Sequence, residues 1–149
     1  MKKIGIASDH GGYNLKEEIK NHLKGEYEIV DFGTDSLDSV DYPDYGVKVA
    51  EAVISCEVEE GILCCGTGIG ISLAANKVPG IRCAVVSDTF SARMSKAHND
   101  ANMISLGERV VGKGLALEII DTWLGTKFEG DRHQRRVGKI TEIEKKYSK

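Results

Sequence analysis

A cysteine followed by a glycine-rich run is the first feature of this sequence that could do chemistry. Cys65 ends an apolar segment and leads into Gly66-Thr67-Gly68-Ile69-Gly70. Where such a run joins a strand to a helix, its free backbone N–H groups point at an anion or an oxyanion. The start of a helix also favours the thiolate form of a nearby cysteine. An isolated cysteine at a strand end is more often a small buried apolar residue, but the glycine run favours a functional interpretation of Cys65.

The best-known glycine-loop motifs do not describe this segment. No Gly-Lys-Ser/Thr closes it, so it is not a nucleotide-binding P-loop. The dinucleotide-binding pattern G-x-G-x-x-G is matched only at Gly66 and Gly68, because Ile71 stands where the third glycine belongs. A cysteine-phosphatase loop needs an arginine six positions after Cys65, and that position is again Ile71. The segment therefore indicates a thiol beside an anion or oxyanion site, without naming the ligand.

Three further groups of polar residues could take part in the same chemistry. Ser8-Asp9-His10-Gly11-Gly12 follows the first apolar run, where a short acidic residue either caps a helix or faces a ligand. His98-Asn99-Asp100 lies at a predicted helix end, a position that also suits a purely structural charged histidine. Arg132 and Arg136 are four residues apart, so they share one helix face and either grip a phosphate together or form a solvated basic surface. A nucleic-acid patch is disfavoured, because the cluster is short and lacks interleaved aromatic residues.

The elements that must position these groups alternate between short β-branched runs and longer helical patterns. We expect strands at Lys3–Ala7, Glu28–Phe32, Glu60–Cys64, Arg82–Val86 and Met103–Leu106. We expect helices at Tyr13–Lys24, Tyr45–Ser55, Gly68–Lys77, Thr89–Ala97, Lys113–Leu124 and Arg132–Tyr147, the last with Asp131 as its N-cap. Such alternation predicts a parallel sheet covered on both faces, with ligands beyond the carboxyl ends of its strands. The last helix has no strand after it, so it packs either on its own sheet or as an arm on a second subunit.

Composition limits the classes of protein to which the chain can belong. Its 149 residues are one domain's worth, enough to fold without a disulfide or metal staple. A net charge of −3 gives no global basic field for nucleic acid or an anionic membrane, and no stretch approaches the ~18 apolar residues of a spanning helix. The cysteines show neither C-x-x-C spacing nor a histidine at zinc-finger distance; they are Cys56, Cys64, Cys65 and Cys83. We expect one cytoplasmic domain over residues 1–149 with reduced thiols, no nucleic-acid or membrane partner, no metal and no cofactor.

Seven blocks, in order along nearly the whole chain, resemble the family of ribose-5-phosphate isomerase type B, which also holds galactose-6-phosphate and allose-6-phosphate isomerases. Each block is short, and their order makes the resemblance specific. The blocks are Ser8-Asp9-His10-Gly11-Gly12, Asp41-Tyr42-Pro43, Cys65-Gly66-Thr67-Gly68-Ile69-Gly70, Ala74-Ala75-Asn76-Lys77, His98-Asn99-Asp100, Leu106-Gly107-Glu108-Arg109-Val110-Val111-Gly112 and Gly130-Asp131-Arg132-His133. One branch of the family uses a glutamate base at the position of Ile71, so this chain, with Ile71 and Cys65, resembles the cysteine users.

The resemblance implies an α/β fold: a three-layer Rossmann-like sandwich around a five-stranded parallel sheet of order 2-1-3-5-4, with an extra C-terminal helix. It implies a homodimer with shared active sites, or a dimer of dimers. The catalytic residues that it implies are Cys65 as proton-transfer base, Thr67 beside it at the sugar, His98 as the group that opens the furanose ring, and Asp9 against the ring hydroxyls. The binding residues that it implies are Ser8, Asp9, His10, Arg109, Arg132 and Arg136, the last two from the other subunit, with Asn99 and the amides of Gly66, Thr67, Gly68, Ile69 and Gly70 at the developing enediolate.

The function implied is interconversion of ribose 5-phosphate and ribulose 5-phosphate in the pentose phosphate pathway. Such an isomerisation needs one base and preformed oxyanion donors, and it needs no metal or redox cofactor. An allose- or galactose-6-phosphate isomerase is an alternative, because its chemistry is identical and only the pocket depth differs. A non-catalytic phosphosugar- or nucleotide-binding module is a second alternative. A thiol redox protein is disfavoured by the missing C-x-x-C.

Overall fold

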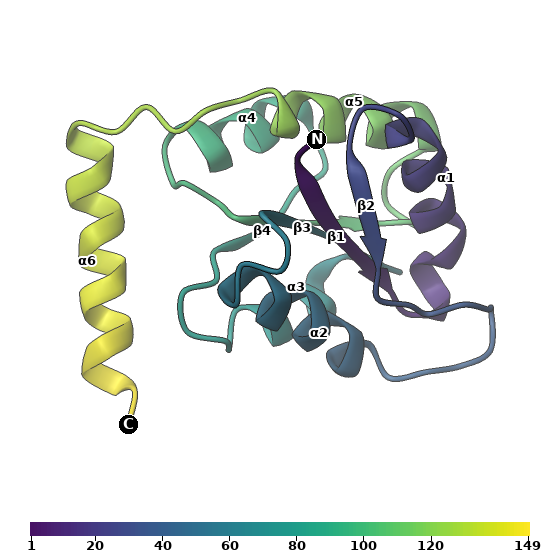
Figure 1. Ribbon diagram of the computed structural model, residues 1–149, viewed down its shortest axis with the longest axis horizontal. Coiled ribbons are helices and arrows are strands. Elements are labelled where there is room, and N and C mark those ends of the chain that lie inside the picture. The colour runs from purple at the N-terminus through teal and green to yellow at the C-terminus, as the bar shows by residue number, and fades with distance from the viewer.

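A five-stranded parallel sheet runs through the middle of the protein, and Figure 1 shows it in the computed structural model, which describes residues 1–149. The strands are β1 (Lys3–Ser8), β2 (Glu28–Asp31), β3 (Glu60–Cys65), β4 (Cys83–Val85) and β5 (Met103–Gly107). Their order is β2-β1-β3-β5-β4, and every neighbouring pair is parallel. The predicted number, direction and order of the strands are confirmed.

Helices cover both faces of this sheet. They are η1 (His10–Gly12, a short 3-10 helix), α1 (Tyr13–Leu23), α2 (Tyr42–Ile54), α3 (Ile69–Ala75), α4 (Thr89–Ala97), α5 (Lys113–Leu124) and α6 (Arg132–Tyr147). One buried apolar cluster joins the sheet to α1 and α5, and a second joins its other face to α2 and α3. Figure 1 shows these two helix layers on opposite sides of the strands. The predicted three-layer α/β/α sandwich is therefore confirmed.

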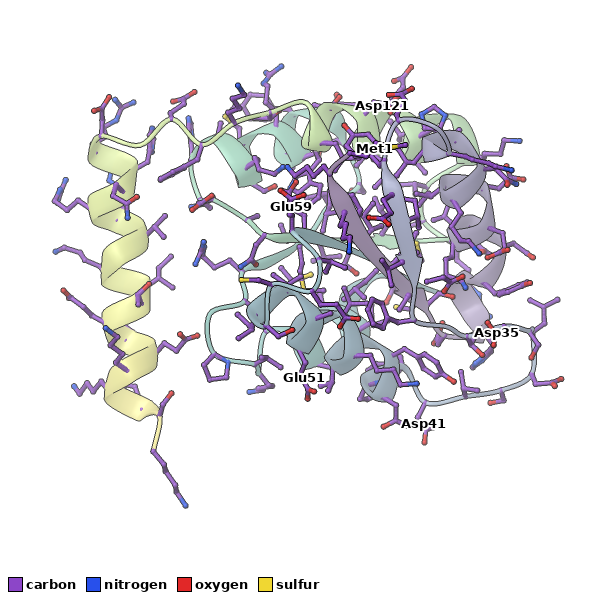
Figure 2. All side chains as sticks on the ribbon, viewed as in Figure 1. Met1, Asp35, Asp41, Glu51, Glu59 and Asp121 are labelled. Atoms are coloured by element: carbon purple, nitrogen blue, oxygen red, sulfur yellow. The ribbon has the colours of Figure 1, made fainter.

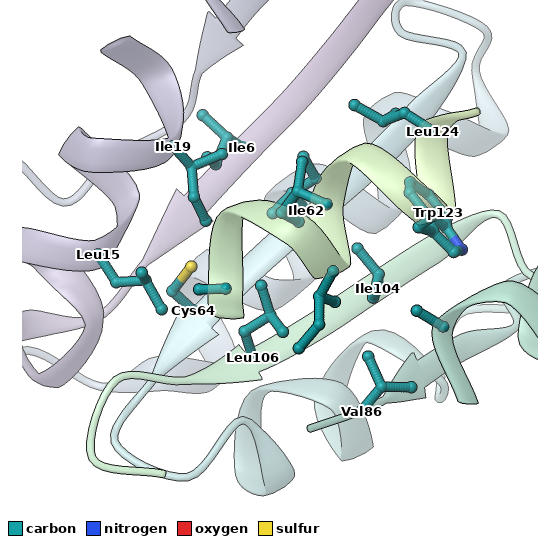
Figure 3. Packing of buried hydrophobic residues seen from close by; sticks show 14 of the residues in the cluster. Ile6, Leu15, Ile19, Ile62, Cys64, Val86, Ile104, Leu106, Trp123 and Leu124 are labelled. Carbon is teal, nitrogen blue, oxygen red and sulfur yellow. The ribbon is translucent and has the colours of Figure 1, made fainter. Parts of the chain in front are cut away.

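The central strand β3 shows how the two clusters divide neighbouring residues. All of β3 is buried, as expected for a strand of a parallel sheet covered on both faces. Because side chains alternate along a strand, Ile62 and Cys64 belong to the cluster with α1 and α5, whereas Leu63 and Cys65 belong to the cluster with α2 and α3. Figure 3 shows the Cys64 side chain inside the first cluster, near Leu15. Cys64 is thus a core residue on the face opposite Cys65.

The start of α2 and the capping of α6 differ from the sequence prediction. Helix α2 begins at Tyr42 rather than Tyr45, because Pro43 occupies the first turn, where a helix tolerates the missing N–H. Asp131 does precede α6, as predicted, but its side chain makes no capping hydrogen bond. Its backbone φ is 50°, whereas a capping residue has an extended backbone that aims its side chain at the first turn. The start of α6 therefore depends on other contacts.

Helix α6 stands beside the β4 side of the molecule and covers neither face of the sheet (Figure 1). Val137 on its second turn is buried, and near its end the Glu144 carboxylate accepts hydrogen bonds of 3.0 and 3.1 Å from the Gly80 N–H. Ile140 and Ile143 remain exposed between these anchors. None of the helices combines the length and apolar character needed to cross a membrane.

A buried lysine ties α1 to the loop after β2. The Lys16 side chain is fully buried, and its Nζ lies 2.9 and 2.8 Å from the two carboxylate oxygens of Asp31 and 2.7 Å from the carbonyl oxygen of Thr34. A buried charge is tolerated when it is paired and fully hydrogen-bonded, as here. This contact anchors the start of the long loop that runs past Asp35 and Asp41 to α2 (Figure 2).

Replacing Asp31 with Asn should lower the free energy of unfolding by about 2 kcal/mol at neutral pH, because the buried Lys16 loses its nearest counter-charge and keeps only Glu17, 3.4 Å away. Burial acts to raise the pKa of the Asp31 carboxyl, but hydrogen bonds from Lys16 and Lys20 outweigh it and hold that pKa below its usual range. A carboxyl whose folded-state pKa is lowered stabilises the fold above its unfolded pKa, about 3.9, and this stabilisation is lost as the pH falls through the folded pKa. Urea unfolding should show the full difference in free energy of unfolding between the parent and Asp31→Asn above about pH 5. This difference should become smaller below about pH 4. A difference that does not depend on pH would contradict this account.

Candidate active site

A hollow of about 390 Å³ lies at the carboxyl ends of β1 and β3, and we call it the strand-end hollow. Strands β1 and β3 are neighbours, and the chain continues from β1 outward to β2 on the other side. This is the point of an open parallel sheet where connections diverge and ligands bind. The residues that line the hollow are Asp9, Tyr42, Cys65, Gly66, Thr67, Ile69 and Gly70.

Close backbone packing brings the loops after β1, β3 and β5 together here. A Cβ atom on Gly12 would stand 2.4 Å from the backbone of Cys64, and one on Gly107 would stand 2.6 Å from the backbone of Thr67. Gly68 has a φ of 80°, a conformation that side chains rarely adopt. Only glycine fits these positions without displacing backbone, so the three loops form one compact surface.

Asp9 both caps a helix and faces the hollow, the two alternatives that its position in the sequence left open. Its Oδ1 accepts hydrogen bonds from the N–H groups of Gly11 at 2.9 Å and Gly12 at 3.2 Å, and so caps η1. The residue is almost fully buried and also lines the strand-end hollow. The capping bonds hold the carboxylate in one orientation at the edge of the hollow.

Cys65 lies at the floor of the hollow with its sulfur already hydrogen-bonded. The Gly68 N–H donates to Cys65 Sγ at 3.0 Å, a contact that stabilises negative charge on sulfur. Thr67 Oγ1 accepts from the Ile69 N–H at 3.1 Å, so its hydroxyl hydrogen is free for a ligand. The N–H groups of Gly66 and Thr67 donate no hydrogen bond within the chain. The loop therefore presents a thiol, a hydroxyl and free amides to one small space.

His10 and Arg109 do not line the hollow themselves, but His10 follows Asp9 and Arg109 packs near Gly66, both of which do. The Val40 N–H donates to His10 Nδ1 at 3.2 Å; because Nδ1 accepts, the ring hydrogen of a neutral His10 sits on Nε2 and can point at an anion. The Arg109 N–H donates to the Gly66 carbonyl at 3.1 Å, and its side chain lies 3.7 Å from the position of a Cβ on Gly66. The glycine loop thus holds Arg109 against the thiol segment.

Ser8, which the sequence predicted as a binding residue, and Tyr42, which it did not, lie differently with respect to the hollow. Ser8 is fully buried, its hydroxyl has no partner, and it does not line the hollow. Ser8 pairs with Cys64 in the sheet, on a face that alternation separates from Cys65. Tyr42 does line the hollow, and its ring packs over Gly70. The Asp41-Tyr42-Pro43 block was the available signal for Tyr42.

The remaining predicted residues lie at the other end of the sheet. Strand β5 pairs Met103 with Gly61 and Gly107 with Cys65, so at least four strand residues, about 13 Å, separate His98 from the level of Cys65. The Asn99 carbonyl accepts from Arg82 Nε at 3.0 Å, just before β4 begins. The two α6 residues predicted to bind phosphate, Arg132 and Arg136, are exposed. Figure 1 shows α6 on the side of the molecule opposite α1.

His98 belongs instead to a group that we call the histidine cluster: His98, Glu129 and His133. The two imidazole rings stack with centroids 4.1 Å apart and an interplanar angle of 9°. The Nε2 atoms of His98 and His133 lie 3.6 and 3.5 Å from Glu129 Oε1. Burial of His133, together with the nearby positive charges of His98 and Arg132, lowers the pKa of His133. The sequence prediction contained no such cluster, because Glu129 lies in a segment without any motif.

The family model described as Ribose/Galactose Isomerase matches residues 4–140 of this chain. The ribose-5-phosphate isomerase B of Escherichia coli (strain K12) is 52% identical over 147 residues, which make up 98% of this chain and 99% of that protein. The ribose-5-P isomerase B of Listeria innocua is 41% identical over 145 residues, 97% of this chain and 98% of that protein.

Solved structures agree with this match. Ribose-5-phosphate isomerase B from Clostridium thermocellum has a TM-score of 0.97 and 67% identity, with 98% of this chain and 99% of that chain covered. The enzyme from Mycoplasma genitalium, solved with bound ribulose-5-phosphate, has a TM-score of 0.91 and 42% identity, with 96% of each chain covered. Sequence and fold match over nearly the full length, and the chain therefore belongs to the ribose/galactose isomerase family.

Proposed function

We propose that this protein interconverts ribose 5-phosphate and ribulose 5-phosphate, with Cys65 as the base that moves a proton between two neighbouring carbons of the sugar. The observation that carries the proposal is the strand-end hollow, where the Cys65 sulfur lies beside free amides and a fixed carboxylate. Near-full-length relatives named for ribose-5-phosphate isomerisation support the same substrate.

The groups in the hollow match the steps of an aldose–ketose isomerisation. A base removes the proton from the carbon next to the carbonyl, an enediolate forms, and the proton returns to the former carbonyl carbon. Cys65 takes and returns this proton as the thiolate and thiol. The free N–H groups of Gly66 and Thr67 face the negative oxygen of the enediolate, where each such donor is typically worth about 3–4 kcal/mol. Asp9 and Thr67 orient the sugar hydroxyls.

A second copy of the chain completes the site in this proposal. Ring opening needs an acid and base, the role that we assign to His98, and the sheet separates His98 from Cys65 of the same chain by about 13 Å or more. Arg132 and Arg136 make no ion pair within their own chain, although each carries a full charge. In a homodimer, His98, Asn99 and these two arginines would serve the hollow of the partner, alongside its His10 and Arg109.

Exposed apolar residues support association of two copies. Leu73, Phe90 and Val110 are each about 60% exposed on α3, α4 and the loop after β5, and Ile143 is equally exposed on α6. Exposed large apolar residues of this number are typical of interaction surfaces. Covering them and the free side of α6 in one interface would remove this apolar surface from water. A dimer is the smallest assembly that does so, and a dimer of dimers would contain the same site.

The cytoplasm is our proposed compartment. All four cysteines are free, and free thiols are the ordinary state of proteins in a reducing compartment.

Turnover of ribose 5-phosphate tests the proposal directly. The protein should form ribulose 5-phosphate from ribose 5-phosphate with and without a chelator. Turnover of allose 6-phosphate or galactose 6-phosphate, compared as kcat/KM, would assign the substrate length. Binding of ribose 5-phosphate without turnover of any of the three would instead support a phosphosugar-binding module.

Replacing Cys65 with Ala should lower kcat by about 10²–10⁴-fold, because the proton-transfer base is lost. The fold and ribose 5-phosphate binding should be largely retained. Cys64→Ala is the matched control, since Cys64 packs in the core on the opposite face, and it should reduce stability more than turnover. Activity of Cys65→Ala within tenfold of the parent would rule out Cys65 as the base.

Alkylation should separate Cys65 from the two other buried thiols. Burial raises the pKa of Cys83 to about 12, and burial together with the neighbouring Cys65 raises the pKa of Cys64 far above its ordinary value. In a Cys56→Ser background, iodoacetamide at about pH 8 should label Cys65 first and abolish activity, because only a thiolate reacts readily. Ribose 5-phosphate should protect the thiol. Mass spectrometry that finds Cys64 labelled as fast as Cys65 would contradict the assignment.

Mixing two impaired variants, assayed at a ribose 5-phosphate concentration well below the raised KM, tests the shared site. Arg132→Ala/Arg136→Ala should raise KM, because charge-assisted bonds to the phosphate are worth roughly 1.5–3 kcal/mol each, and Cys65→Ala should not turn over. If the arginines act in the partner, subunit exchange creates mixed dimers with one complete site, and activity should reappear. Exchange shown by native mass spectrometry without recovered activity would mean that the arginines serve their own subunit.

A further inference from the structure

The histidine cluster has the composition and spacing of a metal site. One potential ligand atom from each of His98, Glu129 and His133 lies within 4.8 Å of the other two. The two Nε2 atoms face the same carboxylate oxygen, Glu129 Oε1, at 3.6 and 3.5 Å. Two imidazoles and one carboxylate are a ligand set that zinc proteins commonly use.

The spacing of these atoms fits a shared cation better than a hydrogen-bonded group. Hydrogen bonds between nitrogen and oxygen are typically about 2.7–3.2 Å long, shorter than either distance here. Two ligands of a tetrahedral Zn²⁺ with bonds of about 2.0–2.1 Å stand roughly 3.4 Å apart. The two rings are stacked nearly parallel, at 9°, so one imidazole must rotate out of the stack before both Nε2 atoms and the carboxylate can hold a zinc ion between them.

A second, independent observation points to a ligand at this place. The side chain of His133 is 7% exposed, and its Nε2 is buried without a hydrogen-bond partner. Buried polar atoms in proteins are nearly always satisfied. Because this unpartnered atom is directed at Glu129 and His98, a cation bound between the three would satisfy it.

The backbone holds the three ligands in place, and one side of the cluster remains open. The Glu129 N–H donates to the Ala97 carbonyl at 3.0 Å, which ties the segment before α6 to the end of α4 next to His98. The His133 N–H donates to the Gly130 carbonyl at 3.0 Å. Side-chain exposures of 38% for His98 and 56% for Glu129 leave an entry path and room for water as a fourth ligand.

We propose that His98, Glu129 and His133 form a binding site for a divalent transition-metal ion, Zn²⁺ above all. Imidazole and carboxylate ligands favour zinc and its neighbours over Mg²⁺ and Ca²⁺, which prefer oxygen ligands. The site is not required for isomerisation. Bound metal occupies Nε2 of His98 and so removes its ring-opening acid and base; this inhibitory consequence, unlike metal binding itself, rests on the proposed function.

Titration of the metal-free full-length protein with Zn²⁺ and with Co²⁺ tests the site. Calorimetry should give one strong Zn²⁺ site per chain. Glu129→Gln, an exposed change that spares the fold, should weaken binding at least tenfold, and His133→Asn should do the same. The matched control Glu118→Gln, an exposed glutamate on α5 outside every ion pair, should bind as the parent does. Bound Co²⁺ should show visible bands of tetrahedral nitrogen and oxygen ligation.

Three results would overturn the proposal: no strong Zn²⁺ site, unchanged affinity in Glu129→Gln, or a thiolate-to-cobalt charge-transfer band showing that cysteines hold the metal. The isomerase assay separates the site from the proposed catalytic role. Zn²⁺ should inhibit the parent at concentrations that fill the site. Inhibition of Glu129→Gln by the same fraction of its own metal-free rate should need a Zn²⁺ concentration at least tenfold higher. Binding without inhibition would uphold the metal site and count against His98 as the ring-opening residue.

Discussion

Backbone packing at glycine is the constraint on which the strand-end hollow depends. Gly12 and Gly107 press against the backbone of the thiol segment so closely that a Cβ would stand 2.4 and 2.6 Å from it. Any side chain there would force the loops after β1, β3 and β5 apart. A misplacement of about 1 Å between a base and its substrate is enough to lower a rate 10²-fold. The glycines therefore set how well Cys65 and Asp9 are aligned, although they carry no reactive group.

The direction of the strands imposes a second constraint. In a parallel sheet every strand ends at the same edge, so loops such as the one after β3 gather there, while each helix returns the chain to the opposite edge. Helix α4 follows this rule and delivers His98 to the amino ends of β4 and β5. One chain of this topology cannot bring His98 to Cys65. The reach of α6 and the exposed apolar residues of α3 and α4 then find a common explanation in a second subunit.

The sequence alone was sufficient to predict the sheet, whereas features that depend on particular residues were missed. Regular alternation of β-branched runs and helical patterns predicted five strands and the last helix correctly. The spacing of apolar residues that distinguishes a strand from a helix is visible within a short stretch of sequence. The opposite facing of Cys64 and Cys65 followed from strand alternation alone. The start of α2 was missed because Pro43 signals either a loop or a first helical turn. The histidine cluster could not be predicted, because it joins His98 to a segment about thirty residues away through a single backbone bond.

Cys65 and His98 lie apart within one chain, so different neighbouring groups contact each of them. The Cys65 sulfur is governed by the Gly68 amide and the glycine loop, whereas His98 is governed by Glu129 and the stacked ring of His133. No ion pair of either group reaches the other, and about 13 Å of strand lies between their levels in the sheet. A change at the histidine cluster therefore reaches the thiol only through assembly of the shared site. Within one chain, the groups proposed for ring opening and for proton transfer thus belong to different ends of the same sheet.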